Sequence, residues 1–93
     1  MYIDFGNHWE IDPSTITVVD HGNWILVCAN PERDTRFSLK KDQVNWFVEK
    51  LTNATGDDVT VEILNGDVAI SVHIARYLFV PLIEALNGDN NDN

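Results

Sequence analysis

The sequence predicts an α+β fold, in which an antiparallel sheet of about four or five strands carries two helices on one face. Three observations support this class. Short runs of β-branched and aromatic residues alternate with turn signals, residues 59–72 have the pattern of a tight hairpin, and two segments show the apolar spacing of helices. The chain has 93 residues, of which 44% are hydrophobic, so it contains enough apolar material for one domain with a modest core.

The first third of the chain is predicted to consist mainly of strands. A short strand is expected over Tyr2–Phe5, and residues 15–19 form a second candidate because they are rich in β-branched side chains. Trp24–Ala29 is continuously apolar, which is typical of a strand that is buried on both faces, and we place Trp24 in the core. Residues 20–23 join these two strands as a turn, and residues 35–37 extend the sheet.

The first helix is predicted over residues 40–53, with Ser38 as its N-terminal cap. The spacing i, i+3, i+4 and i+7, which places side chains on one face of a helix, is given by Val44, Phe47, Val48 and Leu51. Trp46 lies off this face. It is therefore either a partly exposed aromatic residue or part of a second contact surface.

A hairpin and a second helix are predicted in the last third of the chain. Residues 59–64 and 67–72 form the two strands, and Asn65-Gly66 forms a type I′ turn between them. Helical spacing then continues from Ala75 towards a stop at Asn87-Gly88, and Pro81 predicts a kink or a fresh helix start near Val80.

Because each helix follows a hairpin, the chain can be described as a ββα-ββα pseudo-repeat, although any two amphipathic helices share this spacing. We expect residues 1–88 to form a single α+β domain. Residues 89–93 are expected to be a flexible acidic tail.

The charge of the chain restricts its partners. There are 15 acidic and 6 basic residues, giving a net charge of -9, which works against direct contact with a nucleic-acid backbone. The same charge is compatible with a basic protein partner, with metal cations or simply with solubility, which is the commonest explanation. The single cysteine, Cys28, cannot form an intrachain disulfide, and its apolar surroundings favour a buried structural role. We see neither a signal peptide nor a membrane-spanning run, so we expect a cytoplasmic protein without membrane contact.

Motifs that carry chemistry are missing. The sequence contains no nucleotide-binding glycine loop, no Gly-x-Ser-x-Gly and no pair of His or Cys with metal-ligand spacing. A metal site built from His8, Glu10, Asp20 and His21 is conceivable, but polar loops explain these residues equally well. We therefore predict a protein that is not an enzyme and that has no cofactor and no metal.

Six residues are candidates for binding a partner, namely Trp9, Trp46, Arg33, Arg36, Asp57 and Asp58. The two tryptophans lie outside the clearest core patterns, and tryptophan is enriched at interface hot spots. The two arginines belong to a cluster of four basic residues within nine positions, which would suit an acidic partner. The two aspartates are adjacent carboxylates just after the first helix. Simpler explanations are core-edge tryptophans and solvated charges.

These patterns leave three functional hypotheses. The first is a small, acidic, non-enzymatic protein-binding module that acts through an aromatic and acidic surface, with a homodimer as an open alternative to a monomer. The second is an acidic inhibitor that imitates nucleic acid, as small phage proteins can, and it requires a continuous stripe formed by Asp57, Asp58, Glu62, Asp67 and Glu84. The third is a small metal-binding protein or enzyme, which requires His and carboxylate side chains to converge in a pocket.

Overall fold

The computed structural model describes residues 1–29 and 35–90 of the chain, and in these residues six strands form two three-stranded sheets. The first sheet has the strand order β1-β6-β5. In it, β1 (Tyr2–Phe5) is parallel to β6 (Val68–Ala75), which is antiparallel to β5 (Asp58–Asn65). The predicted strand over Tyr2–Phe5 is confirmed.

The second sheet has the order β2-β3-β4, and all of its neighbours are antiparallel. It consists of β2 (Thr17–Asp20), β3 (Trp24–Ala29) and β4 (Thr35–Lys40). A 3-10 turn, Pro13–Thr15, precedes β2, and the Asp12 side chain caps it by accepting the Ser14 backbone N–H. The proline at the start of this turn explains why β2 begins two residues later than predicted.

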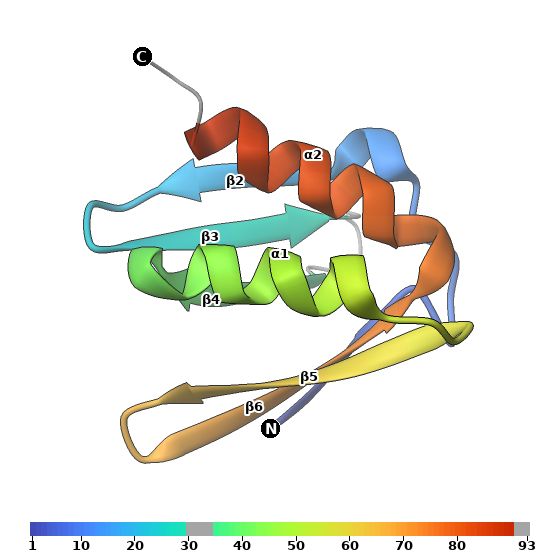
Figure 1. Ribbon diagram of the computed structural model, residues 1–93, viewed down its shortest axis with the longest axis horizontal. Helices are drawn as coiled ribbons and strands as arrows, with labels where there is room; N and C mark the ends of the chain where they lie inside the picture. Colours follow the sequence, from blue (N-terminus) through green and yellow to red (C-terminus); the bar gives the residue numbers. More distant parts are fainter. Residues whose placement is uncertain (30–34, 91–93) are drawn as a thin grey trace.

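Two helices, α1 (Val44–Asn53) and α2 (Phe79–Asn90), pack against each other in front of the second sheet, while the β5-β6 hairpin lies beneath α1 (Figure 1). Each helix follows a strand through one 3-10 turn, which is Lys41–Gln43 before α1 and Arg76–Leu78 before α2. The core therefore fills the angle between the two sheets and is closed by the helices.

The aromatic centre of the core joins both sheets to α1. The rings of Phe5 and Phe37 meet edge to face at 5.5 Å, and the Phe37 ring lies 5.4 Å from that of Phe47. These side chains are almost completely buried, at 0%, 3% and 0% exposure. Since burying a phenylalanine stabilises a fold by about 1.5–3 kcal/mol, this contact chain is a major link between β1, β4 and α1.

The predicted single sheet of four or five strands is replaced by two sheets of three strands each. The sheets adjoin where β1 contacts β4, but among the described residues no backbone ladder joins these two strands. β1 instead pairs with β6, a partner too distant in the sequence to leave a local signal. The ββα-ββα pseudo-repeat stays a prediction. In its favour, each helix follows a strand and a 3-10 turn; against it, the first sheet contains a parallel strand pair whereas the second is entirely antiparallel.

Several boundaries differ from the prediction for local reasons. Ser38 lies inside β4 and does not cap a helix, so α1 starts at Val44. The β5-β6 turn consists of Gly66 and Asp67, one residue later than predicted, with Gly66 at a φ of 67°. When the turn moves by one residue, each residue of β5 pairs with a residue two positions further along β6. Because side chains alternate with a period of two, every residue stays on the same face of the sheet.

α2 begins at Phe79, so Pro81 is its third residue. The first N–H groups of a helix have no acceptor within the helix, so a proline at this position breaks no helical hydrogen bond. The predicted fresh start near Val80 thus agrees with the structure. The helix continues past Asn87-Gly88 and includes the first two residues of the predicted tail, while residues 91–93 lie outside the described part.

The prediction that β3 is buried on both faces is wrong. Its core face is formed by Ile25, Val27 and Ala29, whereas Trp24 is 39% exposed and Cys28 is half-buried on the opposite face. Both helices cover the same face of this sheet, and none of the described helices or strands covers the other face (Figure 1). Within the described residues, neither helix is long and apolar enough to cross a membrane.

Candidate functional site

Polar and aromatic side chains gather on the outer face of the first sheet, opposite the core. Because side chains alternate along a strand, Phe5 of β1 points into the core, whereas Tyr2 and Asp4 point outward. His73 of β6 is the direct neighbour of Asp4 in the parallel pairing. Asp58, the first residue of β5, completes a group of polar side chains contributed by all three strands.

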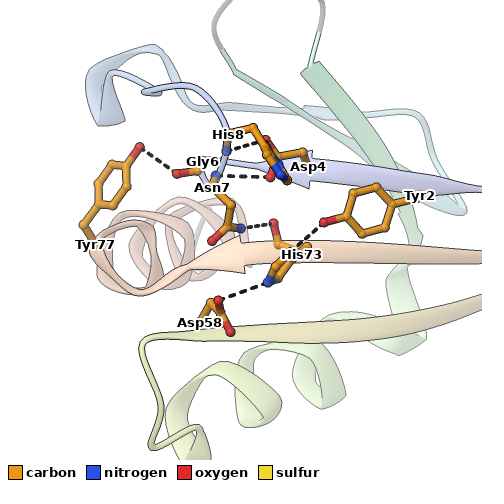
Figure 2. A network of polar contacts seen from close by, with 8 residues as sticks. All are labelled: Tyr2, Asp4, Gly6, Asn7, His8, Asp58, His73 and Tyr77. Carbon is orange, nitrogen blue, oxygen red and sulfur yellow. Dashed lines mark hydrogen bonds and ion pairs between the residues drawn. The ribbon is translucent and has the colours of Figure 1, made fainter.

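A chain of contacts links Tyr2, His73 and Asp58 across the sheet (Figure 2). The Tyr2 hydroxyl lies 2.6 Å from Nδ1 of His73, and Nε2 of the same ring lies 3.1 Å from Oδ2 of Asp58. An ionised carboxylate can only accept hydrogen bonds, so Nε2 carries the proton, and Nδ1 of a neutral imidazole then accepts the tyrosine hydroxyl. The His73 side chain therefore ties together the three strands of the sheet.

This chain does not activate Tyr2 as a nucleophile. Desolvation, followed by the negative charges of Asp4 and Asp58, raises the pKa of the Tyr2 phenol above its usual value. The hydroxyl consequently stays protonated at neutral pH and acts as a hydrogen-bond donor. The contact chain therefore holds the side chains of Tyr2, His73 and Asp58 together.

Asp4 fixes the loop that follows β1. Its side chain is only 6% exposed, and its two oxygens accept the backbone N–H groups of Asn7 at 3.1 Å and His8 at 2.8 Å. The His8 ring also approaches the same carboxylate, with 3.4 Å between Nδ1 and Oδ2. The Asn7 side chain in turn donates to the backbone carbonyl of His73 at 2.9 Å. The loop is thus bonded to β6 as well as to β1 (Figure 2).

Gly6 allows this loop to turn back sharply. Its φ is 100°, and a Cβ atom at this position would lie 2.5 Å from Cδ1 of Leu78 and 3.1 Å from the Tyr77 hydroxyl. The Tyr77 hydroxyl donates to the Gly6 carbonyl at 3.4 Å and accepts the backbone N–H of the buried Ile11 at 3.0 Å. Tyr77 therefore joins the entry of α2 to the loop.

The loop and Tyr77 border a shallow hollow of about 330 Å³, whose lining includes Trp9 and Glu10. Trp9 and Tyr77, which line this hollow, are 37% and 46% exposed, and Tyr2, on the outer face of β1, is 55% exposed. We call the group formed by Tyr2, Trp9, Glu10, Asp58, His73 and Tyr77 the β1-β6 surface. It combines exposed aromatic rings with carboxylates.

Only two of the six predicted partner-binding residues lie on the β1-β6 surface, namely Trp9 and Asp58. Asp57 precedes Asp58, and its backbone carbonyl accepts the Arg76 N–H at 2.9 Å. Trp46 is half-buried on α1, where it packs against the core, and Nζ of Lys50 lies 6.0 Å from the centre of its ring.

The predicted basic patch lies elsewhere. Arg36 is exposed on β4, opposite Cys28 in the second sheet, and Arg33 lies outside the described residues. Sequence reasoning missed Tyr2, His73 and Tyr77. The alternation within Tyr2–Phe5 was the one available signal, because it places Tyr2 and Asp4 on the same face.

A larger groove of about 810 Å³ lies between the β2-β3 turn, the Lys41–Gln43 turn and the β5-β6 turn. Its wall includes Trp24, whose ring stacks on that of His21 at 4.3 Å. The cation of Lys41 pairs with Asp20 at 2.8 Å, and Lys40 and Asp42 add one charge of each sign. The groove therefore combines an aromatic ring with charges of both signs.

Across residues 1–29 and 35–90, no group of three or more His, Cys, Asp and Glu side chains is placed to hold a metal ion. Comparison of the chain with protein-family models, with curated proteins and with solved structures gave no match in any of the three.

Proposed function

We propose that this protein is a small non-enzymatic binding module that recognises a basic segment of a protein partner through the β1-β6 surface. The observation that carries this proposal is the exposure of Tyr2, Trp9 and Tyr77 next to a network that holds their neighbours in place. Exposed aromatic side chains held in one conformation lose little entropy on binding, and they are typical of interface hot spots.

Electrostatics supports a basic partner. Asp58 and Glu10 lie beside the aromatic rings, and the whole chain carries a net charge of -9. An arginine or lysine side chain can contact an aromatic face and a carboxylate together. The net charge would also accelerate the encounter with a positively charged partner at low ionic strength.

A panel of short peptides that contain lysine and arginine tests this proposal, with matched peptides in which glutamate replaces every basic residue. Calorimetry should detect binding of basic peptides only. Trp9→Ala and Asp58→Asn should each weaken it about tenfold or more, since loss of a hot-spot contact commonly costs above about 1 kcal/mol. Trp46→Phe is the matched control, because Trp46 lies on α1, outside the β1-β6 surface.

Equal binding of basic and acidic peptides, or binding that is unchanged by Trp9→Ala and Asp58→Asn, would contradict the proposal. Light scattering on the same samples measures whether the protein forms the homodimer that the sequence left open. A cytoplasmic location, the lack of a cofactor and the lack of direct nucleic-acid binding stay predictions from composition.

The hypothesis of a nucleic-acid mimic has weaker support. Asp58 and Glu62 lie on the outer face of β5 with Thr60 between them, and Asp67 lies at the end of the same hairpin. Four residues of a strand span about 13 Å, however, whereas duplex DNA carries a charge about every 1.7 Å along its axis. Glu84 belongs to α2, which lies away from this hairpin (Figure 1). We therefore rank the mimic below the binding module.

A further inference from the structure

Among the strands that the structure describes, β6 is the single neighbour of β5, so β5 forms an edge of the first sheet. The pairing between these strands is continuous from Asp58 opposite Ala75 to Asn65 opposite Val68. The eight residues of β5 contain no proline and no lysine, which are common means of blocking an exposed edge. Along this edge the strand is regular enough to pair with another chain.

The backbone groups that point out of this edge follow from the hairpin geometry. In a hairpin with a two-residue turn, the flanking pair is hydrogen-bonded, and bonded pairs then alternate with non-bonded ones. Asn65, Ile63, Val61 and Val59 accordingly bond to β6, and the Arg76 N–H bonded to the Asp57 carbonyl continues this alternation.

The intervening residues of β5 therefore direct their backbone groups away from β6. One of these groups already has a partner, because the Leu64 carbonyl accepts the side-chain amide of Gln43 at 3.1 Å. In the described part of the chain, no residue bonds to the outward backbone groups of Thr60 and Glu62. These two residues lie at the centre of the edge.

The charges beside this edge determine which kind of partner strand can pair with β5. The segment from Asp57 to Ala75 carries four acidic residues and neither lysine nor arginine. In antiparallel pairing with a second copy, centred on Thr60, Asp58 would lie opposite Glu62 of the copy. Like charges placed directly opposite destabilise such a pair, whereas lysine or arginine at these positions stabilises it.

We propose that the edge of β5 accepts an extended basic segment of the partner as an additional antiparallel strand. Backbone bonds to Thr60 and Glu62 supply affinity, and basic side chains next to Asp58 and Glu62 supply selectivity. This inference rests on the proposed function, because Asp58 belongs both to the β1-β6 surface and to this edge.

The geometry predicts which amides of the partner make these bonds. In an antiparallel ladder, residues that are paired opposite each other point to the same face. Basic residues on the outer face therefore lie opposite Asp58, Thr60 and Glu62, and their own N–H groups face β5. The apolar residues between them direct their N–H groups to solvent.

The probe is a seven-residue peptide with blocked ends in which lysine and valine alternate. Two further versions carry a methyl group on the backbone nitrogen of every lysine or of every internal valine. All three have the same charge. The unmodified peptide and the valine-methylated peptide should bind alike, whereas lysine methylation should reduce affinity at least tenfold. Equal binding of the two methylated peptides would overturn the inference.

Substitution in the protein gives a second readout. Thr60→Pro removes an outward N–H that the pairing with β6 does not use, a position where an edge strand tolerates proline. Thr60→Val is the matched control, and thermal unfolding followed by circular dichroism verifies that both variants are folded. Thr60→Pro should bind the unmodified peptide at least tenfold more weakly than Thr60→Val, and equal affinities would contradict the inference.

The two proposals fail in different ways. If basic peptides bind in a manner that depends on Trp9 but not on backbone methylation, strand addition is wrong and the binding module stands. If no basic peptide binds at all, both proposals are wrong.

Discussion

The Tyr2 hydroxyl meets Nδ1 of His73 at 2.6 Å, although the two residues lie 71 positions apart in the sequence. This contact crosses from β1 to β6, and His73 extends it to Asp58 on β5. The same three strands carry the core residues Phe5, Ile74 and Val61 on their other face. The proposed binding surface is therefore supported directly by the hydrophobic core.

Tyr77→Phe should destabilise the protein more than Tyr2→Phe. The Tyr77 hydroxyl accepts the backbone N–H of Ile11, whose side chain is fully buried, so its loss leaves that donor without a partner at a cost of about 1–3 kcal/mol. Tyr2 is 55% exposed, and water can replace its hydroxyl at His73. Urea unfolding of both variants measures the difference. A lower unfolding midpoint for Tyr2→Phe than for Tyr77→Phe would contradict this explanation.

Asp4→Asn should destabilise the loop after β1 and lower the free energy of unfolding by about 1–3 kcal/mol. Each carboxylate oxygen of Asp4 accepts a different backbone N–H, and an asparagine offers only one acceptor oxygen. Hydrogen exchange at Asn7 and His8 should accelerate in the variant. Asp12→Asn is the control, because one oxygen of that exposed side chain accepts both bonds from Ser14. Unchanged exchange rates in Asp4→Asn would disprove the role of Asp4.

Gly6→Ala and Gly22→Ala form a matched pair that separates steric overlap from backbone strain. Both glycines have a φ near 100°, so each substitution adds about 1–2 kcal/mol of backbone strain. The Cβ atom at residue 6 would also overlap Leu78, whereas no atom lies within 4 Å of the Cβ position at residue 22. Thermal unfolding should therefore show a clearly larger loss for Gly6→Ala. Equal losses would mean that Leu78 moves aside at little cost.

Stability should fall as the pH drops into the acid range. Hydrogen bonding to Lys41, and then to the Gly22 backbone, lowers the pKa of Asp20, while the backbone and hydroxyl of Ser14 lower that of Asp12. A carboxyl with a lowered pKa in the folded state stabilises that state above its unfolded pKa, near 3.9. This contribution disappears as the pH falls through the lower folded value.

Urea unfolding at pH 7 and at a series of pH values below 4 measures this loss. The double variant Asp12→Asn, Asp20→Asn should show a flatter dependence on pH over the same interval. A dependence as steep as that of the unmodified protein would assign the acid sensitivity to other carboxyl groups.

Local patterns predicted the elements well where one face of an element is buried. Phe47 and Leu51 are core residues of α1, as their spacing indicated, and the β5-β6 hairpin forms in the part of the chain where it was predicted. The tight turn lies one residue later than predicted, at Gly66 and Asp67, and Gly66 has a positive φ of 67°. Strand and helix periodicity could not show that residues 38–40 belong to a strand, because Ser38 also suits a helix cap.

The arrangement of the elements was harder to predict than the elements themselves. Nothing in Tyr2–Phe5 indicates that this strand pairs in parallel with residues 71–74, so neither the split into two sheets nor the meeting of Tyr2 with His73 was foreseen. Trp24 was placed in the core because its strand is apolar, but it is 39% exposed on a face that no described helix or strand covers. Of the proposed site, Trp9 and Asp58 were found from residue type, whereas the tyrosines required the tertiary structure.

The parallel pairing of β1 with β6 also determines the order in which the chain can assemble. Residues 2–5 are synthesised before residues 71–74 and have to wait for them before their backbone groups are paired. Until then the Phe5 ring lacks the strand that holds it in the core. Contacts between such distant residues slow folding, so we expect the closure of this sheet to be a late step and the second sheet with α1 to form earlier.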